Sequence, residues 1–427
     1  MPADTRLWHP FANMHAVRGH EHVIARGDGC YVWDEDGNRF LDGTASLWNV
    51  NVGHGRTEIV DAAMAQMREL ASYQVFGAFA NRPALDLAER LASFAPVDDP
   101  RVFLGSGGGD AIDTAAKIAR RHFIVRGETE RVHIISRTGG YHGTHGFGTS
   151  IGGIEANVTN WGPLIGDTST VPYDSLEALE AEIQRVGPDR VAAFFCEPVI
   201  GAGGFYPPPE GYIEGVADLC AEHGVLFVVD AVICGFGRLG TWFGVERWED
   251  VRPDMITFAK GVTSGYLPLG GVVVNGKVSA PFWEGDAWFR HGPTYSGHPT
   301  VCAAAMANLD IMERENLLAR GAELEDEIAT ALGTVSGHPL VGDVRAGIGA
   351  LGAVAFAREA LAEAPDLPAR IYAAARDRGV LFRPLGDAVA FSPALVMTRE
   401  EVDHAAEVVG EALDAVARDV PAAAGTR

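Results

Sequence analysis

Residues 226–260 read LFVVDAVICGFGRLGTWFGVERWEDVRPDMITFAK and decide the fold. Each end of this stretch is a short apolar run, at residues 226–229 and, with Thr257 as its one polar member, at residues 255–259, and a charged residue follows each run, Asp230 and Lys260. Strands that are apolar at every position have both faces covered, which is typical of a parallel sheet between helices. Ligands of such sheets collect at the carboxyl ends of the strands. We therefore expect an α/β fold with Asp230 and Lys260 at its ligand-binding edge.

The same pattern continues on both sides of this stretch. Further apolar strands are predicted at residues 101–104, 132–136, 191–196 and 271–274. Helical spacing of apolar residues is found at residues 58–70, 83–94, 110–121 and 212–223. This alternation predicts a large domain with a mostly parallel central sheet flanked by helices.

A second, smaller domain is expected from the two chain ends. A chain of 427 residues exceeds what one hydrophobic core usually sustains. The start contains a predicted hairpin at residues 30–42, and a long helical stretch at residues 301–332 leads into shorter mixed elements at residues 351–356, 368–378 and 388–391. We expect a large domain over residues 55–325 and a small α+β domain formed by residues 1–54 and 326–427. The alanine-rich tail after Val420 is expected to be disordered.

Composition excludes several classes of protein. The formal net charge of −23 argues against nucleic-acid binding, which needs a basic face. No apolar run is long enough to span a membrane, and the start of the chain lacks the apolar segment of a secretory signal. The five cysteines have no CxxC spacing and are odd in number, which predicts reduced thiols in a cytoplasmic protein.

Lysine is scarce in this chain, and that singles out Lys260. Only three of the 34 basic residues are lysines, namely Lys117, Lys260 and Lys277. A lysine desolvated at a strand end has a lowered pKa and becomes a nucleophile toward carbonyl groups. Lys117 is expected on the outer face of a helix and Lys277 in a surface turn. The alternative for Lys260, an exposed lysine past the strand, is weakened by the preference of this chain for arginine.

Four further candidates lie at predicted strand ends. Asp230 ends an apolar strand, where a carboxylate needs a partner such as a protonated pyridine nitrogen. The glycine-rich turn around Gly107 opens a helix and suits a phosphate, although an ordinary tight turn explains it equally well. Tyr141 with His142 in a glycine-rich loop suits stacking on a planar cofactor, and Glu197 follows another strand. Each of these residues also has an ordinary structural explanation. Asp230 could cap a helix, Tyr141 could fill a gap between loops, and Glu197 could belong to a plain turn at a strand end.

Metal and hydrolase chemistry are not indicated. No HExxH motif or Cys/His ligand spacing accompanies the histidines, so we expect no metal site. The stretch from Gly292 to Gly297 (GPTYSG) lacks the GxSxG pattern of a serine hydrolase.

Taken in order, FVVDAVICGFGRLG, PDMITFAKGVTSGYLPLGG, YHG, an EP pair and GPTYSGHP resemble the class III aminotransferases that use pyridoxal 5'-phosphate (PLP) and have fold type I. The resemblance runs from about Trp8 to Asp403 and is strongest to the ω-transaminases. It implies transfer of an amino group from a primary amine or an ω- or β-amino acid to a keto acid, with pyruvate expected.

The resemblance assigns roles around the cofactor. Lys260 matches the Schiff-base lysine that also shuttles a proton, and Asp230 matches the partner of the pyridine nitrogen. Gly107, Gly108 and Gly109 match the phosphate turn. Tyr141 with His142, and Val232, match the residues at the cofactor ring, and Glu197 matches the residue beside the cofactor hydroxyl. Thr294 matches a threonine that reaches the phosphate from the neighbouring subunit. The threonine implies a homodimer with shared active sites.

The resemblance also assigns a substrate pocket. Trp48 matches a pocket aromatic, Tyr141 also faces the substrate, and Arg383 in LFRPLGD matches a mobile arginine that binds a substrate carboxylate. A surface salt bridge is the alternative for Arg383. Phe79, or Phe76 in its place, is expected to line the pocket.

Three positions depart from the family pattern. Ala231 stands where the family usually has glutamate, Gly109 replaces a serine or threonine of the phosphate turn, and Pro293 replaces a larger residue before Thr294. At Gly109 one hydroxyl contact to the phosphate is lost.

Alternatives to transamination remain open at this point. The same fold supports amino-acid racemases and decarboxylating aminotransferases. A non-catalytic binding module is the alternative from a different class.

Overall fold

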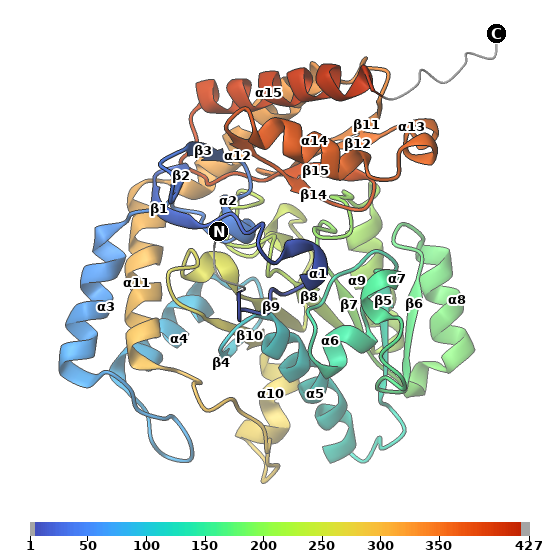
Figure 1. Ribbon diagram of the computed structural model, residues 1–427. Coiled ribbons are helices and arrows are strands. Elements are labelled where there is room, and N and C mark those ends of the chain that lie inside the picture. Colours follow the sequence, from blue (N-terminus) through green and yellow to red (C-terminus); the bar gives the residue numbers. More distant parts are fainter. Residues whose placement is uncertain (1–4, 420–427) are drawn as a thin grey trace.

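The computed structural model describes residues 5–419 and contains a seven-stranded sheet (Figure 1). Its strands lie in the order β4 (Arg101–Gly105), β10 (Gly270–Val274), β9 (Met255–Phe258), β8 (Leu226–Asp230), β7 (Val191–Cys196), β5 (His133–Arg137) and β6 (Thr168–Val171). The pairings from β9 to β6 are parallel, and β10 is antiparallel to both of its neighbours. The predicted mostly parallel central sheet is therefore confirmed.

Successive residues of the central strands point into two different cores. In β8, Phe227 and Val229 belong to the larger core, whereas Leu226 and Val228 belong to a second core that includes α5 (Gly108–Val125). Buried residues of α8 (Leu176–Val186) and α9 (Tyr212–His223) lie in the larger core. Because both faces of β8 are covered, an uninterrupted apolar sequence is required there.

Two four-stranded sheets are built from the two ends of the chain. The first contains β1 (Ile24–Asp28), β2 (Tyr31–Asp34), β3 (Arg39–Asp42) and β13 (Val380–Leu381), which pairs in parallel with β3. The second contains β11 (Val341–Arg345), β12 (Gly352–Phe356), β15 (Ala388–Phe391) and β14 (Arg383–Pro384). Its helices are α12 (Leu317–Gly333), α13 (Arg358–Glu363), α14 (Leu367–Arg376) and α15 (Arg399–Ala417), and this C-terminal part lies above the large sheet in Figure 1.

The remaining helices complete the molecule. The helix α11 (Pro299–Arg314) packs against α3 (Thr57–Leu70) and α4 (Arg82–Phe94). Shorter elements are α1 (Met14–Val17), α2 (Ala45–Trp48), α6 (Gly146–Ser150), α7 (Glu155–Val158), α10 (Gly276–Trp283), η1 (Pro188–Arg190), η2 (Val245–Arg247) and η3 (Lys260–Val262). Within residues 5–419, no helix has the length and apolarity needed to cross a membrane.

Several local predictions need correction. The long stretch predicted at residues 301–332 is two helices, because Asn316 has a left-handed backbone (φ 53°) that ends one helix before the next begins. The helix predicted to begin at Asp110 begins at Gly108, and Lys277 lies in the first turn of α10 although it is exposed as expected. The helix α15 has no counterpart among the predicted elements. Residues 420–427, the predicted disordered tail, lie outside the described residues.

Candidate active site

Neighbouring parallel strands end at the same edge of the large sheet and bring the polar candidates together. Asp230 is the last residue of β8, Glu197 follows β7 directly, and Lys260 follows β9 after one residue. The loop after β5 contributes Tyr141 and His142. All five residues line one cavity of about 370 Å³. The fold therefore brings these five residues together in one cavity.

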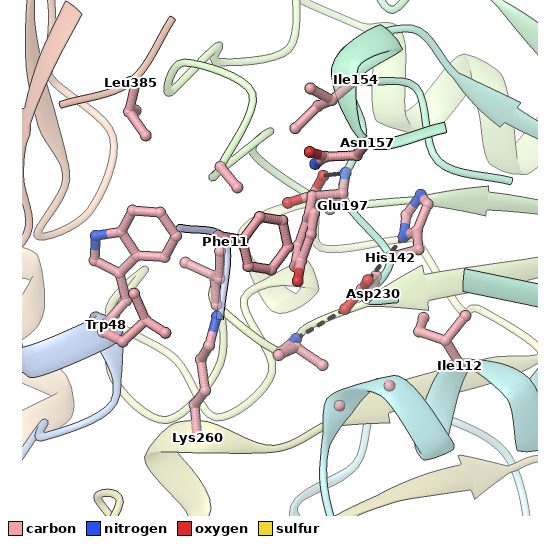
Figure 2. A pocket seen from close by; sticks show the side chains of 18 of the residues that line it. Phe11, Trp48, Ile112, His142, Ile154, Asn157, Glu197, Asp230, Lys260 and Leu385 are labelled. Atoms are coloured by element: carbon pink, nitrogen blue, oxygen red, sulfur yellow. Dashed lines mark hydrogen bonds and ion pairs between the residues drawn. The ribbon is translucent and has the colours of Figure 1, made fainter. Parts of the chain in front are cut away.

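Most of the predicted site residues form the wall of this cavity (Figure 2). They are Trp48, Gly108, Gly109, Tyr141, His142, Glu197, Asp230, Val232, Lys260 and Arg383. Gly107 stands beside them as the N-cap of α5. The wall also contains mainly apolar residues that the sequence did not indicate, namely Phe11, Leu47, Ile112, Gly143, Ile154, Asn157, Ala202, Ile233 and Leu385. They come from distant segments, so no local pattern marks them.

Lys260 projects its amine into the cavity (Figure 2). Its Nζ lies 5.2 Å from the ring centroid of Trp48. Burial lowers the pKa of Lys260 to about 8, although Asp230 and Glu197 favour its charged form. With this pKa, about one tenth of the amine is neutral and nucleophilic at pH 7 and about half at pH 8. The backbone of Lys260 is left-handed (φ 50°), a strained conformation for a non-glycine residue and one that is common at functional sites.

Asp230 is buried and held by three hydrogen bonds. His142 Nδ1 lies 2.8 Å from one carboxylate oxygen, and the backbone N–H of Val232 donates to the other at 3.1 Å. The hydroxyl of Thr257 donates to that second oxygen at 3.2 Å. These contacts fix the orientation of a carboxylate that is only 3% exposed. A fixed buried carboxylate of this kind can stabilise a protonated ring nitrogen.

Glu197 organises the loops around the cavity. Its two carboxylate oxygens accept the backbone N–H groups of Tyr141 and Gly201, each at 3.0 Å. Burial raises the pKa of Glu197, while the nearby His142 opposes that shift. The carboxyl group therefore ties the loop after β5 to the loop after β7.

The glycine turn opens α5 at the cavity wall. The backbone N–H groups of Ser106 and Gly107 donate to the carboxylate of Asp110 at 2.7 and 2.9 Å. The N–H groups of the first helical residues, Gly108 and Gly109, have no partner within the helix and face the cavity end of α5. A Cβ on Gly108 would lie 3.1 Å from a methyl carbon of Val232, so a larger residue here would require the Val232 side chain to shift.

Arg383 and Trp48 line the same cavity as the glycine turn. The guanidinium carbon of Arg383 lies 5.1 Å from the ring centroid of Trp48. Burial lowers the pKa of Arg383, and its Nε has no hydrogen-bond partner among residues 5–419. The alternative interpretation of Arg383, a surface salt bridge, is not seen within the described residues, because Arg383 lines the cavity and forms no ion pair there.

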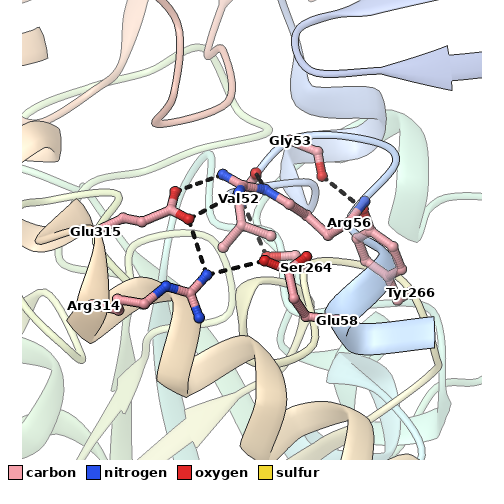
Figure 3. A network of polar contacts seen from close by, with 8 residues as sticks. All are labelled: Val52, Gly53, Arg56, Glu58, Ser264, Tyr266, Arg314 and Glu315. Carbon is pink, nitrogen blue, oxygen red and sulfur yellow. Dashed lines mark hydrogen bonds and ion pairs between the residues drawn. The ribbon is translucent and has the colours of Figure 1, made fainter. Parts of the chain in front are cut away.

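A polar network holds the segment after Trp48 against the segment after Lys260 (Figure 3). The N–H of Val52 donates to the Ser264 hydroxyl at 3.2 Å, and the Tyr266 hydroxyl donates to Gly53 O at 2.9 Å. Arg56, which forms a bidentate ion pair with Glu315, joins this network to the end of α11. Side chains of the segment after Lys260 thereby hold the backbone of the segment after Trp48.

Phe79 and Thr294 lie away from this cavity. Phe79 and Phe76 are exposed and line a different cavity of about 810 Å³ together with Gly292. Thr294 is exposed on the loop that follows Gly292. Within one chain, neither Phe79 nor Thr294 contributes to the wall around Lys260.

The departure at Ala231 lies directly beside the site. Ala231 is fully buried, and its N–H donates to Thr257 O at 2.9 Å. A glutamate at this position would bring a further carboxylate into the region that already holds Asp230.

Comparison with known proteins identifies the family of this fold. The family model for class III aminotransferases matches residues 14–413. A curated relative, the putrescine–pyruvate aminotransferase of Pseudomonas aeruginosa, is 35% identical over 420 residues, which cover 93% of this chain and 91% of the relative.

Two solved structures agree closely with this chain. An amine transaminase from an uncultivated Pseudomonas species, solved in a PLP-bound form, has a TM-score of 0.92 and 38% identity and covers 97% of this chain and 99% of that chain. An (S)-enantioselective ω-transaminase from Thermomicrobium roseum also has a TM-score of 0.92 and 38% identity, with 96% of each chain covered.

Proposed function

The chain belongs to the class III aminotransferases, and we propose that it transfers the amino group of a primary amine or an ω- or β-amino acid to a keto acid, with pyruvate as the acceptor. The observation that carries this proposal is the amine of Lys260, which shares a cavity with the fixed carboxylate of Asp230 and whose pKa burial lowers to about 8. The relatives named above, an amine transaminase and a pyruvate-dependent enzyme among them, support the choice of substrates.

The donor set of the cavity fits PLP, on which class III aminotransferases depend. A glycine cradle at the N-terminus of a helix suits a phosphate, and the buried carboxylate of Asp230 suits a protonated ring nitrogen. We assign the phosphate to Gly107, Gly108 and Gly109, and the ring to Tyr141 and Val232. His142 and Glu197 complete the cofactor site through their contacts with Asp230 and Tyr141.

Proton transfer is the catalytic work of Lys260. When bound, PLP supplies an electron sink for the negative charge that develops on the substrate carbon bearing the amine. The neutral amine of Lys260 accepts the proton from that carbon at Nζ. Because the pKa of Lys260 is about 8, both its neutral and its protonated form are accessible near neutral pH. Asp230 keeps a fixed negative charge beside the ring nitrogen because its three hydrogen bonds prevent it from turning away.

Arg383 and Trp48 are assigned to the substrate. A guanidinium at the cavity wall with a free Nε suits a substrate carboxylate, which it would bind in a bidentate manner. The ring of Trp48 offers an apolar surface to an amine without a carboxylate. This pair supports acceptance of both amino acids and apolar amines.

A homodimer with shared active sites would use the residues left outside the cavity. Phe76 and Phe79 are 49% and 57% exposed, and Tyr295, next to Thr294, is 67% exposed. An exposed apolar group of this kind is typical of a protein interface. We assign this face to the partner subunit, with Thr294 reaching the phosphate and Phe79 the substrate pocket of the other copy.

Two further assignments concern the whole chain. We assign residues 55–325 to a large domain and residues 1–54 with 326–427 to a small domain, in line with the separate sheets that the two parts contain. We also assign the protein to the cytoplasm, because its five cysteines are all buried and unpaired, as in a reducing compartment.

The test is the visible absorption of the purified protein with PLP, followed after addition of a primary amine and then of pyruvate. We expect a visible band that disappears with the amine and returns with pyruvate, because the two additions complete the two halves of a transamination. Lys260→Ala should lose the cycle, whereas Lys117→Ala, which changes an exposed lysine, should retain it.

Product analysis separates the related reactions on the same fold. A racemase would need no keto acid, and a decarboxylating enzyme would release carbon dioxide. A protein without any visible band in excess PLP, or a Lys260→Ala variant that cycles normally, would contradict the proposal.

A further inference from the structure

The phosphate turn of this chain is short of side-chain donors. Gly109 stands where the family pattern has a hydroxyl residue, and the adjacent Gly107 and Gly108 have no side chains, so the one hydroxyl of the turn is that of Ser106 at its start. The N–H groups of Ser106 and Gly107 are already bound by Asp110, which leaves the N–H groups of the first residues of α5 for an anion. A phosphate ester presents three strong acceptor oxygens and nearly two negative charges. The turn by itself therefore offers few donors to such a group.

The ring of His145 fills the space that a side chain on Gly109 would occupy. A Cβ built on Gly109 would lie 3.3 Å from each of three ring atoms of His145, namely Cγ, Cδ2 and Cε1. The loop that carries this histidine runs directly over the turn, because a Cβ on Gly143 would lie 3.0 Å from Cα of Gly109. His145 is thus in contact with the position where the hydroxyl is missing.

The ring of His145 is free to donate. It is exposed in the wall of a neighbouring cavity of about 730 Å³, which shares Phe11 and Asn157 with the cavity of Lys260. Among residues 5–419 no group forms a hydrogen bond with either ring nitrogen. The acidic groups on α5 nearest the loop are engaged elsewhere. Asp110 binds the turn, and Asp113 accepts the N–H groups of Phe147 and Gly148 at 2.9 and 3.1 Å. Asp113 thereby holds the start of α6, where His145 is the N-cap residue, against α5.

We propose that His145 is a phosphate ligand of the cofactor site and replaces the hydroxyl donor that Gly109 lacks. The proposal rests on the proposed function, because it requires that PLP binds in the cavity of Lys260. An imidazole always carries at least one N–H donor, and its protonated form carries two and a positive charge. The loss of a hydroxyl at one position and the gain of a donor from the neighbouring loop compensate each other in this chain.

The experiment compares the affinity of the apoprotein for PLP with its affinity for pyridoxal, which keeps the ring and the carbonyl but lacks the phosphate. Dissociation constants are measured by fluorescence titration or equilibrium dialysis. His145→Phe keeps a ring of similar shape over Gly109 but removes both nitrogens. We expect it to weaken PLP about tenfold, the effect of one charge-assisted hydrogen bond, and to leave pyridoxal unchanged.

A second pair of variants tests the compensation directly. His145→Ala opens the space above the turn and should weaken PLP to a similar extent. Adding Gly109→Ser to His145→Ala places a hydroxyl in that space and should recover most of the lost affinity for PLP. Recovery by a residue change on a different element would not be expected if His145 had only a packing role.

The other outcomes overturn the inference. Unchanged PLP affinity in His145→Phe would show that the nitrogens do not contact the phosphate, and an equal loss for PLP and pyridoxal would show a structural role. The unmodified protein distinguishes this failure from failure of the proposed function. If it binds neither PLP nor pyridoxal, the assignment of the cavity itself is wrong, whereas normal binding with unaffected variants removes only the role of His145.

Discussion

The rate at which the apoprotein captures PLP should depend on pH in a way that reports the environment of Lys260. Capture requires the neutral amine, and burial sets the pKa of this lysine to about 8 in place of the ordinary 10.5. With a pKa of about 8, the neutral fraction rises from about one tenth at pH 7 to about nine tenths at pH 9. The capture rate should therefore rise about tenfold over this interval and then level off.

An unperturbed lysine would behave very differently. With a pKa of 10.5, the rate would rise about a hundredfold between pH 7 and pH 9 and about eightfold more between pH 9 and pH 10. The region above pH 9 therefore decides between the two cases. Stopped-flow absorbance follows capture, and the same measurement with free N-acetyl-lysine provides a reference that cancels the titration of PLP itself.

A capture rate that climbs in parallel with the reference up to pH 10 would refute the reasoning. Arg383→Met supplies a further check of sign. Arg383 lowers the pKa of Lys260, so its removal should move the plateau toward higher pH without abolishing capture.

Three further outcomes are expected. The apoprotein with Lys260→Met should be more stable at pH 7 by up to about 3 kcal/mol, because its native state no longer buries the charge of the lysine. The pKa of Lys260 is lower in the native state than in the unfolded state, so this advantage should fade as the pH rises from about 8 to 10.5. Equal urea midpoints for the variant and the unmodified protein at pH 7 would contradict this expectation. Arg383→Gln should raise KM for β-alanine about 10- to 100-fold and change KM for an apolar amine less than about twofold, and a similar loss for both donors in steady-state kinetics would argue against a carboxylate contact. Gly321→Ala should lower the free energy of unfolding by about 2 kcal/mol, because its Cβ would collide with the carbonyl oxygen of Gly237. The control is Gly333→Ala in the same helix, whose Cβ meets open space and should cost no stability. Equal melting temperatures for the two variants would refute the packing argument.

Much of the site was predictable because its polar members occupy strand ends. Uninterrupted apolar runs reveal strands that are buried on both faces, and the residues that follow such runs must lie at one edge of a parallel sheet. Asp230, Glu197 and Lys260 were found in this way, and the count of three lysines made Lys260 stand out. The match to a family pattern then supplied roles for Val232 and Arg383 that no periodicity could indicate.

Other parts of the site carry no local signal. Phe11 and Leu385 lie at opposite ends of the chain and meet only in the cavity wall. The sequence also did not indicate that the ring of His145 covers Gly109, because that contact depends on the path of the loop after β5.

By itself, the sequence determined the mostly parallel sheet, the lysine and carboxylate at its edge and the family of the chain, because strand periodicity and motif order are local properties. Only the tertiary structure decided where the long helical stretch breaks at Asn316, which side chains close the cavity, and that Phe79 and Thr294 stand outside it. These features depend on contacts between segments that are far apart along the chain. Such contacts arise when the folded chain buries its apolar surface, and residue spacing does not encode them individually.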